Sequence, residues 1–427
     1  MRILVVTTNY HPELTGIGKY NGEMAEWLAK RGHEVKVVTA PPYYPEWSVA
    51  PGYSSWKFTK ERYVGVDVLR CPLYVPRKPR ALTRLLHLFS FSLTSLPATL
   101  WYGAVWRPDV VFVLEPPLMC APAALLARFL AGGKSWLHVQ DFEVDAAFEL
   151  GIVRTKWARS FAESVERWLS NRFDRVSTIS GRMLDRLRRK GIPEDKIVFF
   201  PNWVDHDFIY PLGRPGAYRA QLNIPNDKIL LLYSGNMGEK QGLEMVVEAA
   251  RMLQDDPRYI FLFCGKGAVR DRLEAEARGL KNVSFMDLQP VSRLNELLNS
   301  ADVHLLPQRA DAEDLVMPSK LTAMLASGKP VIAAARTGTE VSDLVSRCGL
   351  VVTPGDAAQL CAAISELGQS AKLRGQLGGV GRKYAVQCLG IDHILEKVFS
   401  VESVAGVSML KPARPLQGKE SQGQCST

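Results

Sequence analysis

The stretch ILLLYSGNMGEKQGLEMVVEAARML, residues 229–253, contains a short apolar run, a glycine-rich loop and an amphipathic segment in that order. The run Ile229–Ser234 has the length and composition of a buried strand. In Leu243–Leu253, apolar residues recur at the spacing of one helix face. The stretch therefore predicts a strand, a turn and a helix, which together form the repeating unit of parallel sheets.

The same order recurs through most of the chain. Strands are predicted at Ile3–Thr7, Val35–Thr39, Val68–Cys71, Val110–Leu114, Trp136–Val139, Arg175–Ile179 and Ile197–Phe199, and again at Ile229–Ser234, Ile260–Gly265, Val283–Met286, Val303–Pro307, Pro330–Ala333 and Leu350–Val352. Helical patterns lie between many of these strands. The alternation predicts an α/β protein with two Rossmann-like parallel-sheet domains facing across a cleft. Ligands of such sheets bind beyond the carboxyl ends of the strands, so the loops at those ends are expected to form the site.

A change in composition divides the chain into segments. The Pro- and Gly-rich sequence PLGRPG, residues 211–216, interrupts the alternation, and the end of the chain is polar without periodicity. We therefore predict an N-terminal domain, a linker, a C-terminal domain, a C-terminal helix and a disordered tail, at 1–205, 206–222, 223–385, 386–403 and 404–427 respectively.

Composition excludes several classes of protein. With 427 residues, of which 47% are hydrophobic and 23% charged, the chain is not a collagen, a disordered tail protein or a small disulfide scaffold. The seven cysteines are scattered, with no Cys-x-x-Cys pair, which predicts reduced thiols in a cytosolic protein. Neither a zinc site nor a cofactor is predicted, because no Cys/His cluster has ligand spacing. The apolar N-terminal run is too short for a secretory signal.

The net charge of +9 is uneven, since residues 1–212 carry 28 basic and 21 acidic side chains and the remainder carries 25 and 23. Arg77-Lys78-Pro79-Arg80 and Arg84 directly precede the Leu- and aromatic-rich stretch 85–102, which Pro97 interrupts. This stretch is too short and too broken for a spanning helix. It predicts a helix lying at an anionic membrane surface, and the alternative is a buried helix beside solvated basic residues. The basic residues form no recognisable nucleic-acid module, so nucleic acid is not predicted as a partner.

Glycines and cations follow several predicted strands. Gly16 and Gly18 follow the first strand, where glycine allows close backbone approach and a helix start offers free N–H groups to an anion. Later loops offer the same chemistry, and the alternative for each is an ordinary surface turn. Their candidate phosphate and donor contacts are Gly235, Asn236, Gly238, Lys240, Gly265, Gly267, Asp314, Ser319, Lys320 and Glu340.

Three carboxylates, Asp141, Glu143 and Asp145, follow the predicted strand Trp136–Val139. Carboxylates beyond a strand end are candidates for binding sugar hydroxyls or for acid–base work, while helix capping is the alternative for Asp141. His138 lies inside the strand and is predicted to be a packed residue.

The segments 11–18, 28–35, 201–205, 233–244 and 318–332 resemble the retaining family-four glycosyltransferases, which have the GT-B fold. The resemblance implies transfer of a sugar, with retention and without a metal, from a GDP- or UDP-linked donor to a lipid-linked exopolysaccharide intermediate. It implies synthesis of the colanic-acid type, with fucose as a candidate sugar, at the inner face of the cell membrane. The N-terminal domain would hold the acceptor and the C-terminal domain the nucleotide sugar.

Carried over by position, the family's glycine-rich loop falls on Gly16 and Gly18, and its Arg…Lys phosphate pair falls on Asn236 and Lys240. Its Glu-x7-Glu pair falls on Leu315 and Ala323, and its histidine on Gln140, so these acidic and imidazole groups are absent. We therefore expect catalysis to depend on Lys240 and Lys320, which would meet the diphosphate charge, and on Asp141, the carboxylate after the predicted strand. An epimerase- or phosphorylase-type enzyme and a non-catalytic partner of a polysaccharide complex remain as alternatives.

Overall fold

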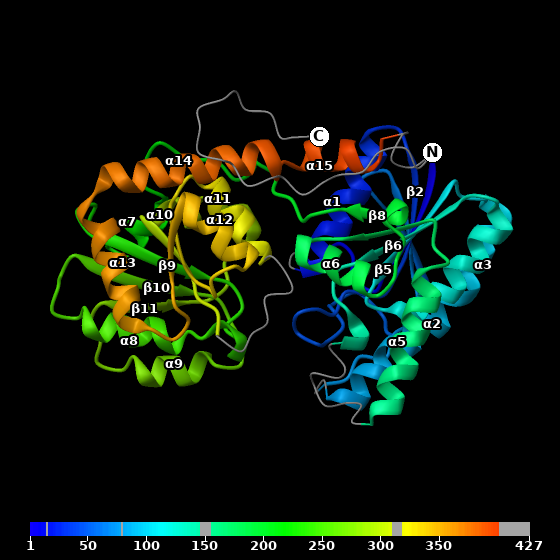
Figure 1. Cartoon of the computed structure of the whole chain (residues 1–427), viewed down its shortest axis with the longest axis horizontal. Helices are drawn as coiled ribbons and strands as arrows, with labels where there is room; N and C mark the ends of the chain where they lie inside the picture. The colour runs from blue at the N-terminus through cyan, green and yellow to red at the C-terminus, as the bar shows by residue number, and fades with distance from the viewer. Residues whose placement is uncertain (14–15, 78–79, 146–154, 310–317, 401–427) are drawn as a thin grey trace. The chain divides into compact units, whose positions relative to one another are not determined.

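The computed structural model describes residues 1–13, 16–77, 80–145, 155–309 and 318–400, which form two compact units (Figure 1). The first unit contains Met1–Pro201 and the described residues from Leu395 onward, and the second contains Asn202–Ile394. Each unit is built on a largely parallel sheet, which confirms the predicted α/β class. The six cysteines in the described ranges are free thiols, as predicted, and Cys425 lies outside these ranges.

The first unit has an eight-stranded sheet in the order β3-β4-β2-β1-β5-β6-β7-β8. Its strands are β1 (Arg2–Val6), β2 (Glu34–Thr39), β3 (Thr59–Tyr63), β4 (Val66–Arg70), β5 (Val110–Glu115), β6 (Lys134–Val139), β7 (Arg175–Thr178) and β8 (Ile197–Phe199). Only the edge strand β3 runs antiparallel to its neighbour in this sheet. The sequence did not predict β3, because TKERY is polar and lacks an apolar face, as is common for an exposed edge strand.

The helices of the first unit are α1 (Gly16–Lys30), α2 (Ala81–Trp101), α3 (Ala121–Ala131), α5 (Lys156–Ser170) and α6 (Gly181–Arg189). Two short turns, η1 (Tyr102–Trp106) and η2 (Leu118–Cys120), follow α2 and β5. The apolar stretch 85–102 lies almost wholly in α2, which continues past Pro97. Across the described ranges, no helix combines the length and the apolar character needed to span a bilayer.

The second unit has a six-stranded parallel sheet in the order β11-β10-β9-β12-β13-β14. Its strands are β9 (Ile229–Ser234), β10 (Tyr259–Cys264), β11 (Val283–Met286), β12 (Val303–Leu306), β13 (Val331–Ala334) and β14 (Gly349–Val352). Its helices are α7 (Ala217–Gln221), α8 (Glu244–Met252), α9 (Arg270–Glu276), α10 (Leu294–Ser300), α11 (Ser319–Ala326), α12 (Glu340–Cys348), α13 (Ala357–Gln369) and α14 (Ala371–Cys388), followed by α15 (Ile391–Val398), which crosses the unit boundary.

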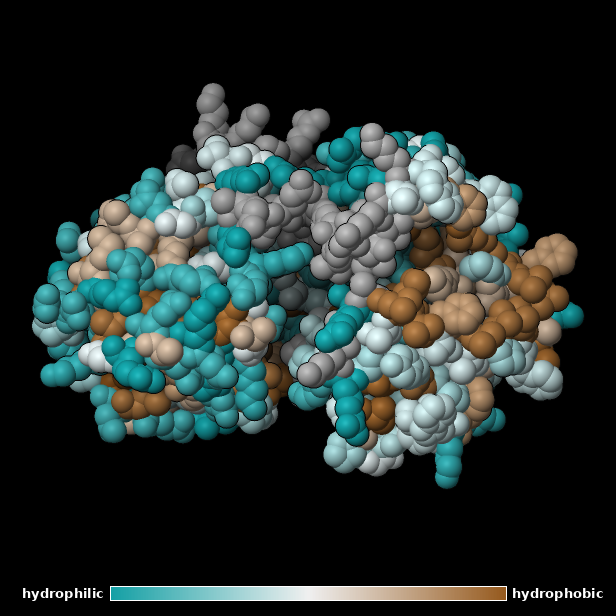
Figure 2. Space-filling view, turned by 90° about the horizontal axis from the view of Figure 1, so that it is seen from below, coloured by the Kyte–Doolittle hydropathy of each residue, from teal (hydrophilic) through white to brown (hydrophobic). Residues whose placement is uncertain are grey.

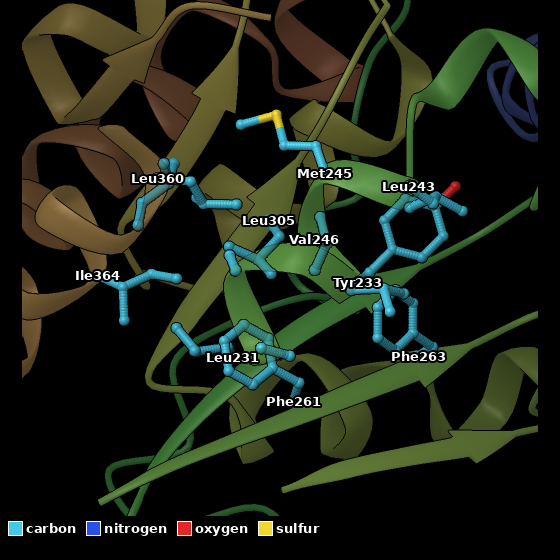
Figure 3. Packing of buried hydrophobic residues seen from close by; sticks show 14 of the residues in the cluster. Leu231, Tyr233, Leu243, Met245, Val246, Phe261, Phe263, Leu305, Leu360 and Ile364 are labelled. Atoms are coloured by element: carbon cyan, nitrogen blue, oxygen red, sulfur yellow. The ribbon is translucent and has the colours of Figure 1, made fainter. Parts of the chain in front are cut away.

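Strand alternation gives the second unit two cores, one on each face of its sheet. Leu231 and Tyr233 of β9 point into a core shared with α8 and α13, and Leu230 and Leu232 point into the opposite core. Figure 3 shows the first of these cores, with Tyr233 beside Phe263. Because both faces are covered, the loops at the strand ends remain as the accessible positions for a ligand.

Two predicted boundaries differ from the observed packing. The segment 206–222, predicted as a linker, contains α7, and its apolar residues Ile209 and Tyr218 are buried in a core of the second unit. The predicted C-terminal helix 386–403 is divided between the end of α14 and α15. Phe399, just after α15, packs in the first unit with its ring 6.0 Å from that of Phe112. The predicted tail, 404–427, lies outside the described residues.

Candidate functional site

Two glycine-rich loops of the second unit pack backbone to backbone beyond β9 and β10. The amide of Gly235 donates to the Cys264 carbonyl at 2.9 Å, and that of Met237 donates to the Lys266 carbonyl at 2.8 Å. A Cβ on Gly265 would lie 1.9 Å from the Gly235 oxygen, and one on Gly267 would lie 2.2 Å from the Met237 oxygen. These two glycines are therefore required by close loop packing, in addition to any role toward a ligand.

Lys320, the second residue of α11, lies close to the first of these loops. Its Nζ is 3.2 Å from the Tyr233 hydroxyl and 4.4 Å from the centroid of the tyrosine ring. Its Cδ lies 3.6 Å from the position that a Cβ of Gly235 would take. No ion pair of Lys320 with an acidic side chain occurs in the described part of the chain. Burial lowers the pKa of Lys320 to about 8, and among the described residues this cation has no acidic partner.

Tyr233 is a site residue that the sequence did not indicate. Its ring belongs to the core, while its hydroxyl donates to the Asn236 carbonyl at 2.5 Å and accepts from Lys320. Burial raises the pKa of Tyr233, so the hydroxyl remains protonated. A tyrosine one residue before the end of a strand that leads into a glycine loop was the available signal.

The other predicted donor residues of the second unit follow neighbouring strands of its sheet. Lys240 lies in the short turn η4 (Glu239–Gln241) with an exposed side chain, and its carbonyl accepts from the Arg309 amide at 3.1 Å. Asn236 is exposed and Gly238 is half-buried. Ser319 and Glu340 are the first residues of α11 and α12, and Asp314 lies outside the described residues. The predicted donor residues in the described ranges therefore lie on the carboxyl side of β9, β10, β12 and β13. No direct contact joins Lys240 to Lys320.

A pocket of about 610 Å³ opens beside α8 in the second unit. Its lining includes Gly242, Glu244, Arg309 and Gly355, and none of the predicted donor residues. Glu244 forms an ion pair with Arg272, so this carboxylate is already partnered. The pocket adjoins the loop that carries Lys240 but is separate from the Lys320–Tyr233 contact.

A buried acid, Glu13, packs against the start of α1 in the first unit. One carboxylate oxygen of Glu13 accepts from the Tyr43 and Tyr44 amides at 2.9 and 3.0 Å, and the other accepts from Asn9 Nδ2 at 2.8 Å. A Cβ on Gly18 would lie 2.7 Å from this carboxylate, so only glycine fits there. Gly16 has φ of +60°, a left-handed conformation that glycine adopts without strain. Glu13 was not predicted from the sequence, because the Tyr43 and Tyr44 amides that it binds lie about thirty residues away.

The three carboxylates after β6 have different surroundings. Asp141 is exposed, whereas Glu143 is partly buried and accepts from the Leu118 amide at 2.8 Å. Burial raises the pKa of Glu143 to about 7. Asp145 is buried and forms ion pairs with Arg186 at 2.8 Å and Lys190 at 3.2 Å. Asp145 therefore already has two cationic partners inside the unit, and its acceptor contact stays a prediction.

A second buried acid, Glu115 at the end of β5, was also missed. Its Oε1 accepts from the Glu143 amide at 3.3 Å, and burial raises its pKa well above the ordinary value. A carboxylate as the last residue of an apolar strand was a signal for this residue in the sequence.

His138 is a packed residue, as predicted. Its Nδ1 is 2.8 Å from Ser177 Oγ, and its Nε2 is 2.9 Å from Gln140 Nε2. Burial lowers its pKa to about 3, so the imidazole is neutral. Gln140, at the position where the resembling family has histidine, extends this buried hydrogen-bonded chain at the end of β6.

Comparison with known proteins matches both units. The family described as "Glycosyl transferase 4-like domain" matches residues 15–203, and "Glycosyl transferases group 1" matches residues 216–384. The chain is 42% identical to the putative colanic acid biosynthesis glycosyl transferase WcaI of Escherichia coli K12, over 93% of this chain and 98% of the relative. It is 26% identical to the probable glycosyltransferase WbjE of Pseudomonas aeruginosa, over 73% and 76% of the two chains.

Two solved structures share the fold. Sucrose-phosphate synthase from Thermosynechococcus elongatus superimposes with a TM-score of 0.71 at 20% identity, over 93% of this chain and 97% of that chain. HepE from Anabaena, in complex with UDP-glucose, superimposes with a TM-score of 0.66 at 15% identity, over 93% and 98%. At these identities the likeness shows the fold alone.

Proposed function

Since the chain belongs to the family-four glycosyltransferases with the GT-B fold, we propose that it transfers a sugar from a nucleotide-diphosphate sugar to a lipid-linked exopolysaccharide intermediate. The product would be a polysaccharide of the colanic-acid type, a proposal supported by the 42% identity to a relative named for that synthesis. The donor would be GDP- or UDP-linked, with fucose as a candidate sugar.

The observation that carries the proposal is Lys320, a cation that has no acidic partner in the part of the chain that the structure describes. A diphosphate supplies the negative charge that the described surroundings of Lys320 lack. The amide of Ser319, at the start of the eight-residue helix α11, adds a donor suited to an anion. The exposed Lys240 on the neighbouring loop would meet the same diphosphate as charge develops on it.

The proposed transfer proceeds with retention and without a metal. The bond between the anomeric carbon and the diphosphate oxygen breaks, a bond to the acceptor oxygen forms on the same face, and the acceptor proton passes to the leaving phosphate. Lys240 and Lys320 stabilise the leaving group by their charge. Asp141, exposed after β6, would hold a sugar hydroxyl, and Glu143 would contribute on the acceptor side of the first unit.

The charged cluster Asp205, His206 and Asp207 has ligand atoms close enough to bind a metal ion. The Asp205 carboxylate already accepts from the Asp207 and Phe208 amides, each at 3.0 Å, in a local turn. We assign no catalytic metal to this turn.

The acceptor side of the first unit has an exposed apolar face, defined here by the exposed large side chains of α2, α3 and α5. These are Leu82, Leu85, Leu86, Phe89, Leu93, Leu96, Trp101, Leu126, Phe129, Leu130, Trp157, Phe161, Val165 and Trp168. Figure 2 shows apolar residues gathered on the first unit. Phe129 is 75% exposed and Trp157 is 74% exposed, which is unusual for side chains of this size.

Basic side chains accompany this apolar face. Arg77, Arg80 and Arg84 are exposed at and before the start of α2. Apolar side chains beside exposed cations suit the boundary between anionic headgroups and acyl chains. We therefore place the protein peripherally at the inner face of the cell membrane, where a lipid-linked acceptor is available.

The test is a thermal-shift panel of nucleoside diphosphates, including UDP and GDP, on the full chain. A ligand present at 100 times its dissociation constant adds about 2.7 kcal/mol of stability, so binding of the correct nucleotide is readily seen. The shift should disappear in Lys320→Met. Stability unchanged by every nucleotide would contradict the proposal, and binding without sugar transfer to any lipid-linked acceptor would favour the non-catalytic alternative.

A further inference from the structure

Two buried charged side chains join the loop after β1 to the loop after β2. Glu13 accepts from the Tyr43 and Tyr44 amides, as described above. Arg70, which is 1% exposed, donates to the His11 carbonyl at 2.5 Å and to the Ala40 carbonyl at 2.8 Å. The carboxylate therefore binds amides and the guanidinium binds carbonyls of the same pair of loops. Such charge-assisted bonds fix the conformation of both loops without a ligand.

This arrangement presents one aromatic ring to solvent, that of Tyr44. The side chain of Tyr44 is 40% exposed although both its own amide and that of its neighbour Tyr43 are bound by Glu13. Its Cε1 lies 3.7 Å from the position that a Cβ of Gly16 would take, so the ring edge lies over the glycine turn at the start of α1. An exposed ring on a rigid loop at the carboxyl edge of a parallel sheet is well placed to contact a ligand.

The same loop also reaches the membrane-facing helix α2. The buried ring of Tyr43 packs 4.6 Å from the ring of His87 and 5.6 Å from that of Trp47, in edge-on contacts. The guanidinium of Arg84, one turn before His87, lies 5.8 Å from the Trp47 ring. The loop that carries Tyr44 is thus packed between the glycine turn and the basic start of α2.

We propose that Tyr44 is the platform of an acceptor-sugar subsite, on which a pyranose ring of a lipid-diphosphate-linked acceptor stacks. This inference rests on the proposed function, because it assumes that the acceptor is carried on a lipid. The lipid lies along the apolar face of α2, its diphosphate meets Arg84, and the attached sugar reaches Tyr44. An aromatic face contacts the C–H groups of a pyranose while leaving the hydroxyls free, and Glu13 is the positioning residue that fixes the ring.

The experiment compares a lipid diphosphate without a sugar and the same lipid diphosphate with one. Binding of farnesyl diphosphate and of farnesyl diphosphate carrying glucose, galactose or N-acetylglucosamine is measured by calorimetry on the full chain. We expect at least one sugar-bearing probe to bind about tenfold more tightly than farnesyl diphosphate, which corresponds to about 1.4 kcal/mol for the stacking contact. Tyr44→Ala should abolish this difference while leaving farnesyl diphosphate binding unchanged, and Tyr44→Phe should retain it.

Glu13→Gln tests the positioning role. Glutamine has one accepting oxygen where the carboxylate uses two, so it cannot bind both the Tyr43 and Tyr44 amides and Asn9 Nδ2. The loop should therefore loosen, and the preference for the sugar-bearing probe should fall. A purely structural role of Glu13 would lower the melting temperature without changing the ratio of the two affinities. Equal binding of all probes by the wild type, or an undiminished sugar preference in Tyr44→Ala, would overturn the subsite. The thermal shift with nucleoside diphosphates reports separately on the donor site of the second unit.

Discussion

Replacing Lys320 by methionine should stabilise the protein while removing its activity. Methionine keeps an unbranched chain for the contact with Tyr233 but removes the buried charge. A residue that exists only to support the fold would give the opposite result, because its loss would leave a cavity or an unpaired partner. The substitution therefore separates a ligand-binding role from a structural one.

The magnitude follows from the pKa of Lys320. This pKa falls from the ordinary 10.5 to about 8 because burial disfavours the charged form. Each pKa unit corresponds to about 1.4 kcal/mol, so the buried charge destabilises the empty protein by about 3 kcal/mol as an upper limit. A domain of this size gains roughly 2–4 °C in melting temperature for each kcal/mol. We therefore expect the transition of the second unit to rise by at most roughly 6–12 °C.

The stabilisation should depend on pH. Below about pH 8, Lys320 is charged in both the folded and unfolded states, so the full cost of burying its charge is present. Above that pH the folded state loses its proton first, and the cost disappears as the pH approaches the unfolded value of about 10.5. The advantage of Lys320→Met over the wild type should therefore shrink between pH 8 and pH 10.5.

The assay is differential scanning calorimetry at several pH values, combined with the nucleotide shift and sugar transfer. Lys281→Met, at an exposed position of the second unit, is the matched control and should change neither stability nor activity. A lower melting temperature for Lys320→Met, or unchanged nucleotide binding by this variant, would refute the assignment of Lys320 to the diphosphate.

Three further predictions concern the remaining charges. Lys240→Ala should reduce turnover about 100-fold without changing the melting temperature, because the exposed side chain of Lys240 contributes to catalysis and not to packing. Turnover equal to that of the wild type would show that Lys240 does not contact the donor. Changing Arg77, Arg80 and Arg84 to glutamine should release the protein from anionic vesicles, because each charge contributes about 1 kcal/mol of binding free energy. The weaker binding to neutral vesicles should stay constant. Unchanged sedimentation with anionic vesicles would contradict binding to the membrane. Glu143→Gln should stabilise the protein at pH 8 but not at pH 4. The pKa of Glu143 is raised to about 7 in the folded state, so the contribution of this side chain to stability falls as the pH rises through about 7. Parallel curves of stability against pH for the variant and the wild type would contradict this.

The sequence predicted the regular elements well because their signals are local. The strands Ile197–Phe199, Ile229–Ser234 and Val283–Met286 match the structure at both ends, since short apolar runs rich in strand-forming residues define them. The edge strand β3 was missed because its exposed, charged residues carry no such pattern. The same reasoning located the loops at the strand ends but not the side chains that hold them.

Those side chains depend on contacts between distant segments. Glu13 pairs with backbone amides after β2, and Lys320 meets Tyr233, which is 87 residues away. Asp145 shows the reverse case, because its position after a strand suggested a ligand contact, whereas Arg186 and Lys190 neutralise it from another helix. A carboxylate in an internal ion pair and one that awaits a ligand look alike in a sequence, and only the three-dimensional partners separate them.

The buried charges of the protein differ in their partners, and the difference bears on function. In the first unit, Arg70 and Asp145 are buried with opposite charges or backbone partners around them, so their burial supports a fixed loop structure. In the second unit, Lys320 has a hydroxyl and an aromatic ring as neighbours but no acidic partner in the described ranges. An uncompensated cation lowers the stability of the empty protein, so retaining it is consistent with a ligand that restores the missing charge. A lysine that binds the diphosphate directly would make donor recognition depend on phosphate charge. Donor binding should then weaken with salt more steeply than hydroxyl-mediated recognition does.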